Sequence, residues 1–263
     1  MPNLKELEVG VMFWAGRDPL ATIQEVKSFG VHCGQLGLPG DLDVSNAATA
    51  WREALASEDF TVITVFCAYT GENYADIPTV QRTVGFIPPE TRAERFSRTL
   101  EASDFAAEIG VKSIACHVGF VPEDPANPEY TAVCRMVQQI CDHAAKHHQT
   151  FALETGQEPA DILLKFVDAV GRPNLGINFD PANMIMYGSG DPILALSVLG
   201  PKLLSVHAKD GNWPPKDAPN ALGKEQPLGC GAVGMEQFVA KLKQIGYKGT
   251  LNVEREVENP EQR

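Results

Sequence analysis

Short apolar runs alternate with amphipathic stretches along most of the chain. The runs are rich in β-branched and other apolar residues, as buried strands are, and apolar residues recur at helical spacing between them. We predict strands over residues 7–13, 31–36, 60–66, 112–117, 151–154, 175–180, 203–207 and 250–254. Eight strands that alternate with helices in this order predict an α/β fold, a single (β/α)8 TIM barrel.

Glycine and proline mark several of the predicted helix ends. Gly30 and Gly110 follow two helices, and Ser45 is predicted to cap a third. The predicted helices cover residues 19–29, 45–56, 88–109, 130–144, 191–199 and 235–245. An eighth barrel helix would have to follow residue 254, where little chain remains.

Four polar residues close four of the predicted strands. They are Glu154, Asp180, His207 and Glu254, with gaps of 26, 27 and 47 residues between them. The first two gaps equal about one strand plus one helix, and the third leaves room for a long insertion. If the strands are parallel neighbours, all four side chains meet at one end of the sheet. Three carboxylates gathered beside an imidazole repel each other unless a divalent cation lies between them.

The ligand set predicts one divalent metal ion per chain. Mixed oxygen and nitrogen donors suit manganese, our first choice, and also Mg, Co, Fe or Zn.

Composition narrows the class of protein. The 263 residues are 44% apolar, and no Gly/Ser/Pro linker divides them, so we expect one domain over residues 1–263. The net charge of −12 disfavours nucleic acids and anionic membranes as partners. The sequence has six cysteines without a C-x-x-C pair, no apolar signal segment and no run of transmembrane length. A reducing cytoplasm is therefore the expected location.

Two connections stand out for their length. Residues 68–89 and 208–234 are rich in glycine and proline, and apart from the helix start at residue 88 no element is predicted within them. Long loops in a compact domain are usually functional, and these two could cover the site and exclude water from it.

Several segments of the C-terminal half carry a family resemblance. The chain resembles the xylose-isomerase-like barrel superfamily, in the broad sugar phosphate isomerase/epimerase group. The resembling segments are Ala152-Leu153-Glu154-Thr155-Gly156, Asn178-Phe179-Asp180-Pro181-Ala182-Asn183, Val206-His207-Ala208-Lys209-Asp210, Pro227-Leu228-Gly229-Cys230-Gly231 and Gly246 to Glu256.

The resemblance implies a metal site and a reaction. The family's four metal ligands fall on Glu154, Asp180, His207 and Glu254, and the two glutamates also move protons in such isomerases and epimerases. A cation would stabilise the enediolate that forms when a carbon next to a carbonyl loses its proton. We therefore expect a metal-dependent isomerase or epimerase acting on a sugar, sugar acid or cyclitol, with Glu154 and Glu254 as the catalytic residues.

Two positions depart from the family pattern. Many relatives have a histidine where this chain has Asn183, and ketose 3-epimerases often have an arginine where it has Trp213. Both positions contact substrate in relatives, so a ketohexose epimerase is not the specific expectation. The candidate substrate-binding residues are His117, Lys209, Asn183, Trp14 and Glu158.

Each candidate also has a purely structural interpretation. The glutamates could be charged strand ends paired with Lys or Arg, Asp180 and Asn183 could belong to a helix start, and His207, like His117, could be a hydrogen-bonded barrel residue. Lys209 could be solvated, and Glu158 could be an acid in a first helical turn. His143 and His147 lie one helical turn apart and could bind a metal, or could face solvent near a helix C-terminus.

Other functions use the same residues. A lyase such as a keto-cyclitol dehydratase could use the same site, with His117 as the acid. An apurinic-site endonuclease would need more metal ligands and a surface suited to DNA. A carbohydrate-binding or scaffold barrel without turnover is the non-enzymatic alternative. A homo-oligomer is a further expectation, by family analogy.

Overall fold

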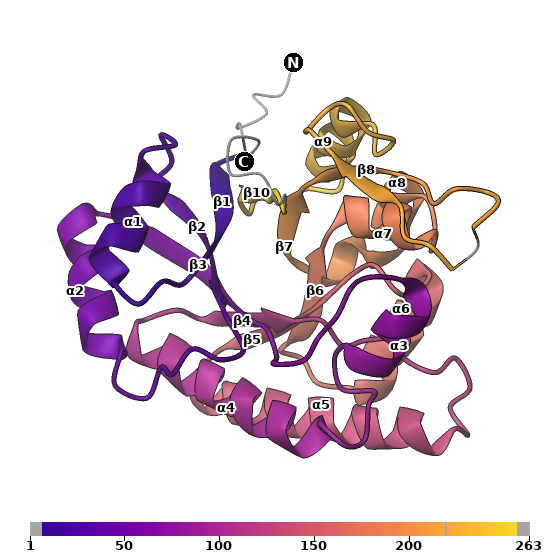
Figure 1. Cartoon of the computed structure of the whole chain (residues 1–263), viewed down its shortest axis with the longest axis horizontal. Helices are drawn as coiled ribbons and strands as arrows, with labels where there is room; N and C mark the ends of the chain where they lie inside the picture. The colour runs from indigo at the N-terminus through magenta and orange to yellow at the C-terminus, as the bar shows by residue number, and fades with distance from the viewer. Residues whose placement is uncertain (1–6, 219, 257–263) are drawn as a thin grey trace.

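The computed structural model describes residues 7–218 and 220–256, and its strands close into a parallel barrel (Figure 1). The strand order around the barrel is β1-β10-β7-β6-β5-β4-β3-β2. The bounds are β1 (Val9–Trp14), β2 (Cys33–Leu38), β3 (Thr61–Cys67), β4 (Ser113–Cys116), β5 (Thr150–Glu154), β6 (Leu175–Phe179), β7 (Leu203–Ala208) and β10 (Leu251–Val253). This confirms the predicted (β/α)8 barrel.

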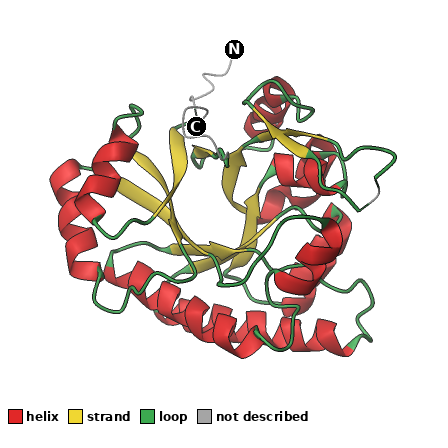
Figure 2. Ribbon diagram, in the orientation of Figure 1, coloured by secondary structure: helices red, strands yellow, loops and turns green. Residues whose placement is uncertain are grey.

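Helices surround the strands on the outside of the barrel (Figure 2). Their bounds are α1 (Pro19–Lys27), α2 (Ala48–Glu58), α3 (Ile77–Thr83), α4 (Arg92–Glu108), α5 (Pro128–Lys146), α6 (Ala160–Val170), α7 (Pro181–Tyr187), α8 (Pro192–Leu199) and α9 (Met235–Gln244), with a 3-10 turn at Gly200–Lys202. The eighth barrel helix would fall mainly on residues 257–263, outside the described residues. No helix in the described ranges is long and apolar enough to cross a membrane.

An acidic or amide side chain before a proline starts several of these helices. Asp18, Asn127, Asp180 and Asp191 each accept a hydrogen bond from a backbone N–H of the first helical turn. The next residue is proline in all four cases, which has no N–H to satisfy and is preset for helical φ. The same local rule therefore begins α7 directly behind β6 and fixes the backbone of Asp180.

The predicted cap at Ser45 is wrong. Helix α2 begins at Ala48, and no side-chain hydrogen bond caps it. The backbone N–H of Ser45 instead donates to Asp43 Oδ1 at 2.9 Å, so Ser45 belongs to the preceding turn. An aspartate two residues earlier offered the stronger local acceptor.

The two long connections contain more structure than predicted. Residues 68–89 include α3, and residues 208–234 include a hairpin of β8 (Asp210–Asn212) and β9 (Lys224–Gln226). The connections also contact each other, because the N–H of Ile77 donates to the carbonyl of Asn220 at 3.0 Å. Both elements are only a few residues long, which gives too little periodicity to read.

The barrel interior is divided into an apolar and a polar part. Met12, Phe66, Ala115 and Ala152 form a small apolar cluster apart from the main core. Fully buried polar side chains also lie on the strands: Gln35, Thr64, Asn178, Ser205, His207 and Asn252. Buried polar groups need partners, so this interior can hold a polar site that an all-apolar barrel could not.

Asp210 joins the beginning of the second long connection to its end. Its Oδ1 accepts from the N–H groups of Gly211 and Val233, at 2.9 and 3.1 Å, and its Oδ2 accepts from Gly229 and Gly231, both at 3.0 Å. A Cβ on Gly231 would lie 2.2 Å from Asp210 Oδ1, so this close approach requires glycine. The two glycines of the Pro-Leu-Gly-Cys-Gly segment thus let its backbone N–H groups approach the Asp210 carboxylate.

Asp210→Asn should lower the free energy of unfolding by about 2–3 kcal/mol, because an amide NH2 would face backbone donors that a carboxylate accepts. Asp217→Asn, at an exposed position of the same connection, is the matched control and should change little. Chemical denaturation of both variants measures the difference. Equal stability of the two variants would show that the Asp210 contacts do not hold this connection.

Candidate metal centre

Four polar side chains meet at the carboxyl ends of neighbouring strands. Glu154 ends β5, Asp180 follows β6, His207 lies near the end of β7, and Glu254 follows β10. These strands are consecutive in the barrel, and pairing in register sets Glu154 beside Asn178 and His207 beside Asn252. One potential ligand atom from each of the four residues lies within 4.8 Å of all the others.

The imidazole of His207 is at the centre of this group. Its Nδ1 lies 3.0 Å from Glu254 Oε2, 3.2 Å from Glu154 Oε1 and 3.6 Å from Asp180 Oδ2. Nδ1 and Asp180 Oδ2 are both buried, and neither has a hydrogen-bond partner of good geometry among the residues that the structure describes. The four donor atoms are thus close enough together for one ion to contact all of them.

A polar network inside the barrel holds the other side of this imidazole. His207 Nε2 lies 3.0 Å from Gln35 Oε1 and 3.1 Å from Asn178 Nδ2. Asn178 Oδ1 in turn accepts from Gln35 Nε2 and from the hydroxyl of Ser205. When Nε2–H donates to Gln35, Nδ1 presents its lone pair to the carboxylates, which is the tautomer a metal ligand needs.

Charge at this end of the barrel is strongly unbalanced. Burial alone would lower the pKa of His207, but the carboxylates of Glu254 and Glu154 outweigh it and hold that pKa well above its usual range. Lys209 shows the same competition: burial opposes its charge, and Glu254, Glu256 and Asp180 raise its pKa. The carboxylates therefore favour any cation placed between them.

Lys209 is buried rather than solvated. Its side chain is 2% exposed, and its Nζ lies 2.6 Å from Glu256 Oε2 and 3.1 Å from Glu254 Oε2. Glu254 thus has two cationic neighbours, which hold its pKa below the usual range against the effect of burial. Burial dominates at Glu154 and raises its pKa, although His117 and His207 oppose the rise.

A cavity of about 160 Å3 opens above the four residues. Glu154 and Glu254 line it, whereas Asp180 and His207 are not among its lining residues. Four of the predicted substrate-binding residues line it as well: Trp14, His117, Asn183 and Lys209. Both long connections contribute to its wall, the first through Glu72 and Tyr74 and the second through Leu222 and Gly223.

His117 and Asn183 both contact the carboxylate of Glu154. His117 Nε2 lies 3.4 Å from Glu154 Oε2, and the side-chain amide of Asn183 donates to Glu154 Oε1 at 3.1 Å. The backbone N–H of Asn183 also donates to Asp180 Oδ1, so the residue belongs both to the start of α7 and to the site. Trp213 is 46% exposed and is not among the lining residues.

Glu158, the fifth predicted substrate-binding residue, is buried but is not among the residues that line the cavity. Its Oε1 accepts from the N–H of Val121 at 2.7 Å, and its Oε2 is buried with no hydrogen-bond partner in residues 7–218 and 220–256. Burial raises the pKa of Glu158 to about 8. The side chain therefore links the segment after β5 to the segment after β4.

Some residues of the site have no counterpart in the sequence prediction. Gln35 and Asn178 orient His207, and Tyr74 and Tyr187 form aromatic parts of the cavity wall. A polar amide in the middle of an apolar strand was the available signal for Gln35 and Asn178. Glu256 lies two residues beyond Glu254, and its pairing with Lys209 required the fold.

A second hollow, of about 530 Å3, lies between the loop after β2 and helix α4. It is larger but more open, and its walls include Asp41, Asp43, Arg95 and Arg98. Arg95 and Arg98 both donate to backbone carbonyls there, so these cations hold loops together. The smaller cavity, which contains the convergent carboxylates, is the better candidate for chemistry.

The sequence family described as Xylose isomerase-like TIM barrel matches residues 23–263. The chain belongs to this family. This confirms the resemblance found in the C-terminal segments, and it extends the match over most of the N-terminal half.

Solved structures of other xylose isomerase-like barrels share the fold. A xylose isomerase domain protein from Planctomyces limnophilus is 42% identical, with a TM-score of 0.91 over 96% of this chain and 90% of that chain. A xylose isomerase-like barrel from Mycobacterium smegmatis, solved in complex with magnesium, is 16% identical, with a TM-score of 0.71 over 98% and 93%. At that identity the second likeness shows the fold alone.

One curated relative has a named activity. An L-ribulose 3-epimerase from Methylomonas sp. is 28% identical over 154 residues, which are 54% of this chain and 47% of the relative. The chain spans about half the length of the curated relatives it matches.

The donor set of this family member fits a divalent cation. Three carboxylates and one imidazole come together while buried, and two of their atoms lack a hydrogen-bond partner in the described part of the chain. Oxygen-rich donors with one imidazole suit several first-row divalent ions.

Glu158→Gln should remove a loss of folding stability that the wild type undergoes as the pH rises. Above about pH 4.5 the unfolded chain releases this proton, whereas the folded chain keeps it until about pH 8. Ionisation of Glu158 therefore lowers wild-type stability as pH rises through this window, by roughly 4–5 kcal/mol in all, and the loss is complete above pH 8. The variant stays neutral and resembles the protonated acid in shape.

Denaturant unfolding of both proteins at pH 5, 6.5 and 8 measures this effect. The free energy of unfolding of the variant, taken relative to that of the wild type, should increase from pH 5 to 6.5 and again from pH 6.5 to 8. A difference that does not vary with pH would refute the raised pKa.

Proposed function

We propose that this barrel is a divalent-metal-dependent isomerase or epimerase that acts on a sugar, sugar acid or cyclitol. One observation carries the proposal: Glu154 and Glu254 both line the cavity, whereas Asp180 and His207 do not. Of the four potential ligands, the two that we propose as proton carriers are thus the two that a substrate could reach, and the other two would hold the ion from below.

The residues that would hold the ion are Glu154, Asp180, His207 and Glu254, with manganese as the first choice. Bound there, the ion would act as a Lewis acid and stabilise the negative charge that develops when a carbon next to a carbonyl is deprotonated. The magnesium complex of the Mycobacterium smegmatis barrel supports a divalent ion in this family.

Protein groups would manage the proton itself. Glu254 follows β10 and Glu154 ends β5, which lie on either side of β7 in the barrel, and both carboxylates come within 3.2 Å of His207 Nδ1. One glutamate could therefore remove a proton and the other return it. Lys209 neutralises Glu254, and His117 lies close enough to exchange a proton with Glu154. The two long connections, through Tyr74 of the first and Leu222 and Gly223 of the second, would limit the access of water to the reacting carbon.

Cavity size and lining support a small polar substrate. About 160 Å3 is below the usual range for drug-sized ligands. Aromatic walls from Trp14, Tyr74 and Tyr187 surround a charged floor, which suits the apolar and hydroxylated faces of a carbohydrate. The L-ribulose 3-epimerase among the relatives supports a sugar as the substrate. Trp213 is exposed and stands where ketose 3-epimerases often have an arginine, so the proposal names no particular sugar.

Glu254→Gln should abolish proton transfer while retaining the ion and the substrate. Gln keeps an oxygen ligand and the size of the side chain, but it is not a base at neutral pH. General-base catalysis contributes roughly 10²–10⁴-fold, and turnover should fall by at least that factor. The assay is deuterium incorporation from D2O next to the carbonyl of ketoses, keto acids and inososes, followed by NMR with product analysis.

Metal content must be measured in the same samples, since an empty site would imitate the loss. Glu236→Gln, on the exposed face of α9, is the matched control and should exchange like the wild type. Normal exchange by a metal-loaded Glu254→Gln enzyme would remove Glu254 from the catalytic role. Elimination products would indicate a lyase instead of an isomerase.

Gln35→Met should weaken Mn2+ binding by about 10–100-fold, because His207 Nε2 loses the acceptor that fixes its tautomer. Met has a similar length and leaves no cavity. Gln24→Met, on the surface of α1, is the control. Mn2+ titration of the stripped proteins measures both affinities, and equal affinity would show that Gln35 does not orient the ligand.

A further inference from the structure

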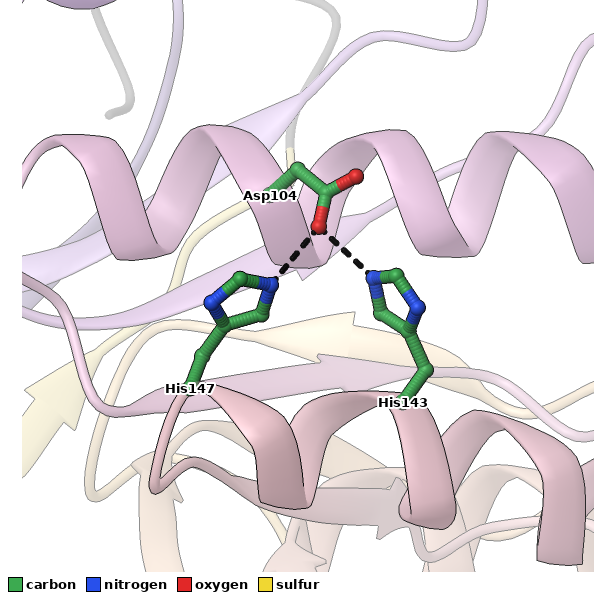
Figure 3. A group of neighbouring side chains, drawn as sticks. All are labelled: Asp104, His143 and His147. Carbon is green, nitrogen blue, oxygen red and sulfur yellow. Dashed lines mark hydrogen bonds and ion pairs between the residues drawn. The ribbon is translucent and has the colours of Figure 1, made fainter.

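Three potential metal ligands meet on the outside of the barrel, between α4 and α5. Asp104 comes from α4, His143 from the last turns of α5, and His147 directly follows that helix. Both imidazoles point from α5 to the same carboxylate oxygen (Figure 3). Asp104 Oδ1 lies 2.6 Å from His143 Nε2 and 2.9 Å from His147 Nε2. We call these three residues the α4–α5 cluster.

We propose that the α4–α5 cluster is a second metal site, which binds one Zn2+ per chain and joins the two helices. This inference does not depend on the proposed enzymatic function.

Helix geometry explains why the two imidazoles converge. Residues four apart lie on the same face of a helix, one turn above the other, and this spacing lets two histidines share one ion. The ring centroids are 5.5 Å apart, and both rings present Nε2. The three donor atoms all lie within 4.8 Å of one another, so a single ion between them needs only small side-chain adjustments.

The helices behind the cluster are held in place by buried polar contacts. Ser103, next to Asp104, donates its hydroxyl to Gln149 Oε1 at 2.6 Å, and Gln149 Nε2 donates back to Ser103 O at 3.0 Å. Gln149 is two residues beyond His147. Both backbones are therefore fixed close to their ligands, and binding has to order little more than three side chains.

Accessibility and donor type indicate zinc. The exposed fractions of the side chains are 49% for Asp104, 19% for His143 and 34% for His147, so an ion can enter and water can complete its coordination. Two imidazoles and one carboxylate with an open position form a typical zinc donor set. The oxygen-rich quartet has only one imidazole, so Mg2+ and Mn2+ should prefer the quartet, whereas Zn2+ should bind at both sites.

The two sites lie at opposite ends of the barrel. Helix α5 ends just before β5 begins, so the α4–α5 cluster belongs to the amino-terminal end of the strands, whereas Glu154 ends β5 at the other end. In barrels of this type the amino-terminal end serves stability rather than chemistry. Zinc bound there would fasten α4 to α5 and raise the melting temperature without entering the cavity.

Zinc titration in two backgrounds separates the sites. Stripped His207→Ala protein should bind one Zn2+ per chain by calorimetry, and the triple variant His143→Ala/His147→Ala/His207→Ala should bind none. Loss of a residue that only hydrogen-bonds to a metal ligand costs roughly 10–100-fold in metal affinity. Loss of a ligand should cost more, so His143→Ala, His147→Ala or Asp104→Asn, each added to His207→Ala, should lower the Zn2+ affinity by at least about 100-fold. His32→Ala, at an exposed position outside both sites, is the matched control and should bind like its parent.

A second readout covers the case in which His207→Ala does not fold. In the wild type labelled with 15N-histidine, Zn2+ should shift the ring signals of His143 and His147, and Mg2+ should not. Unchanged ring signals at a zinc concentration that saturates the protein would overturn the proposal. Equal zinc binding by His207→Ala and the triple variant would overturn it too.

Discussion

Three buried carboxylates at one end of the barrel set the electrostatic condition that the surrounding residues satisfy. Glu154, Asp180 and Glu254 are at most 8% exposed and lie around one imidazole. Charges in such a place need close countercharges, because water cannot screen them there. Lys209 supplies one of these, and it is buried only because Glu254 and Glu256 receive it. The polar barrel interior then follows, since His207 needs hydrogen-bonding groups on its far side.

Spacing along the sequence was sufficient to predict the barrel and the meeting of four side chains. Repeats of one strand plus one helix place every strand end at the same edge, so Glu154, Asp180 and His207 follow from position alone. The contacts between distant segments could not be read in this way. Gln35 reaches His207 across 172 residues, and no local pattern records such a pairing.

Local chemistry also limited the prediction. Ser45 has a side chain suited to capping a helix, but its backbone N–H donates to Asp43 Oδ1 in the turn before α2. Glu158 carries a charge in the unfolded chain at neutral pH, and only the packed segment around Val121 shows that it is buried. Helix α3 and the β8–β9 hairpin are short elements that contact residues beyond their own bounds, as Ile77 of α3 contacts Asn220 and Asp210 of β8 contacts Gly229 and Gly231. Propensity is a poor guide where tertiary contacts decide the conformation.

Gln35 connects the first quarter of the chain to the last third. The four potential ligands all come from β5, β6, β7 and β10, so the C-terminal half contains the whole donor set. A half-barrel of this kind, fused to a foreign N-terminal half, would keep every ligand and still leave His207 Nε2 without its acceptor from β2. Recombination between such barrels therefore preserves the site only when the new N-terminal half has a hydrogen-bond acceptor at the β2 position that Gln35 occupies here. The strand without a recognisable motif, rather than the motif-rich half, limits which halves can be exchanged.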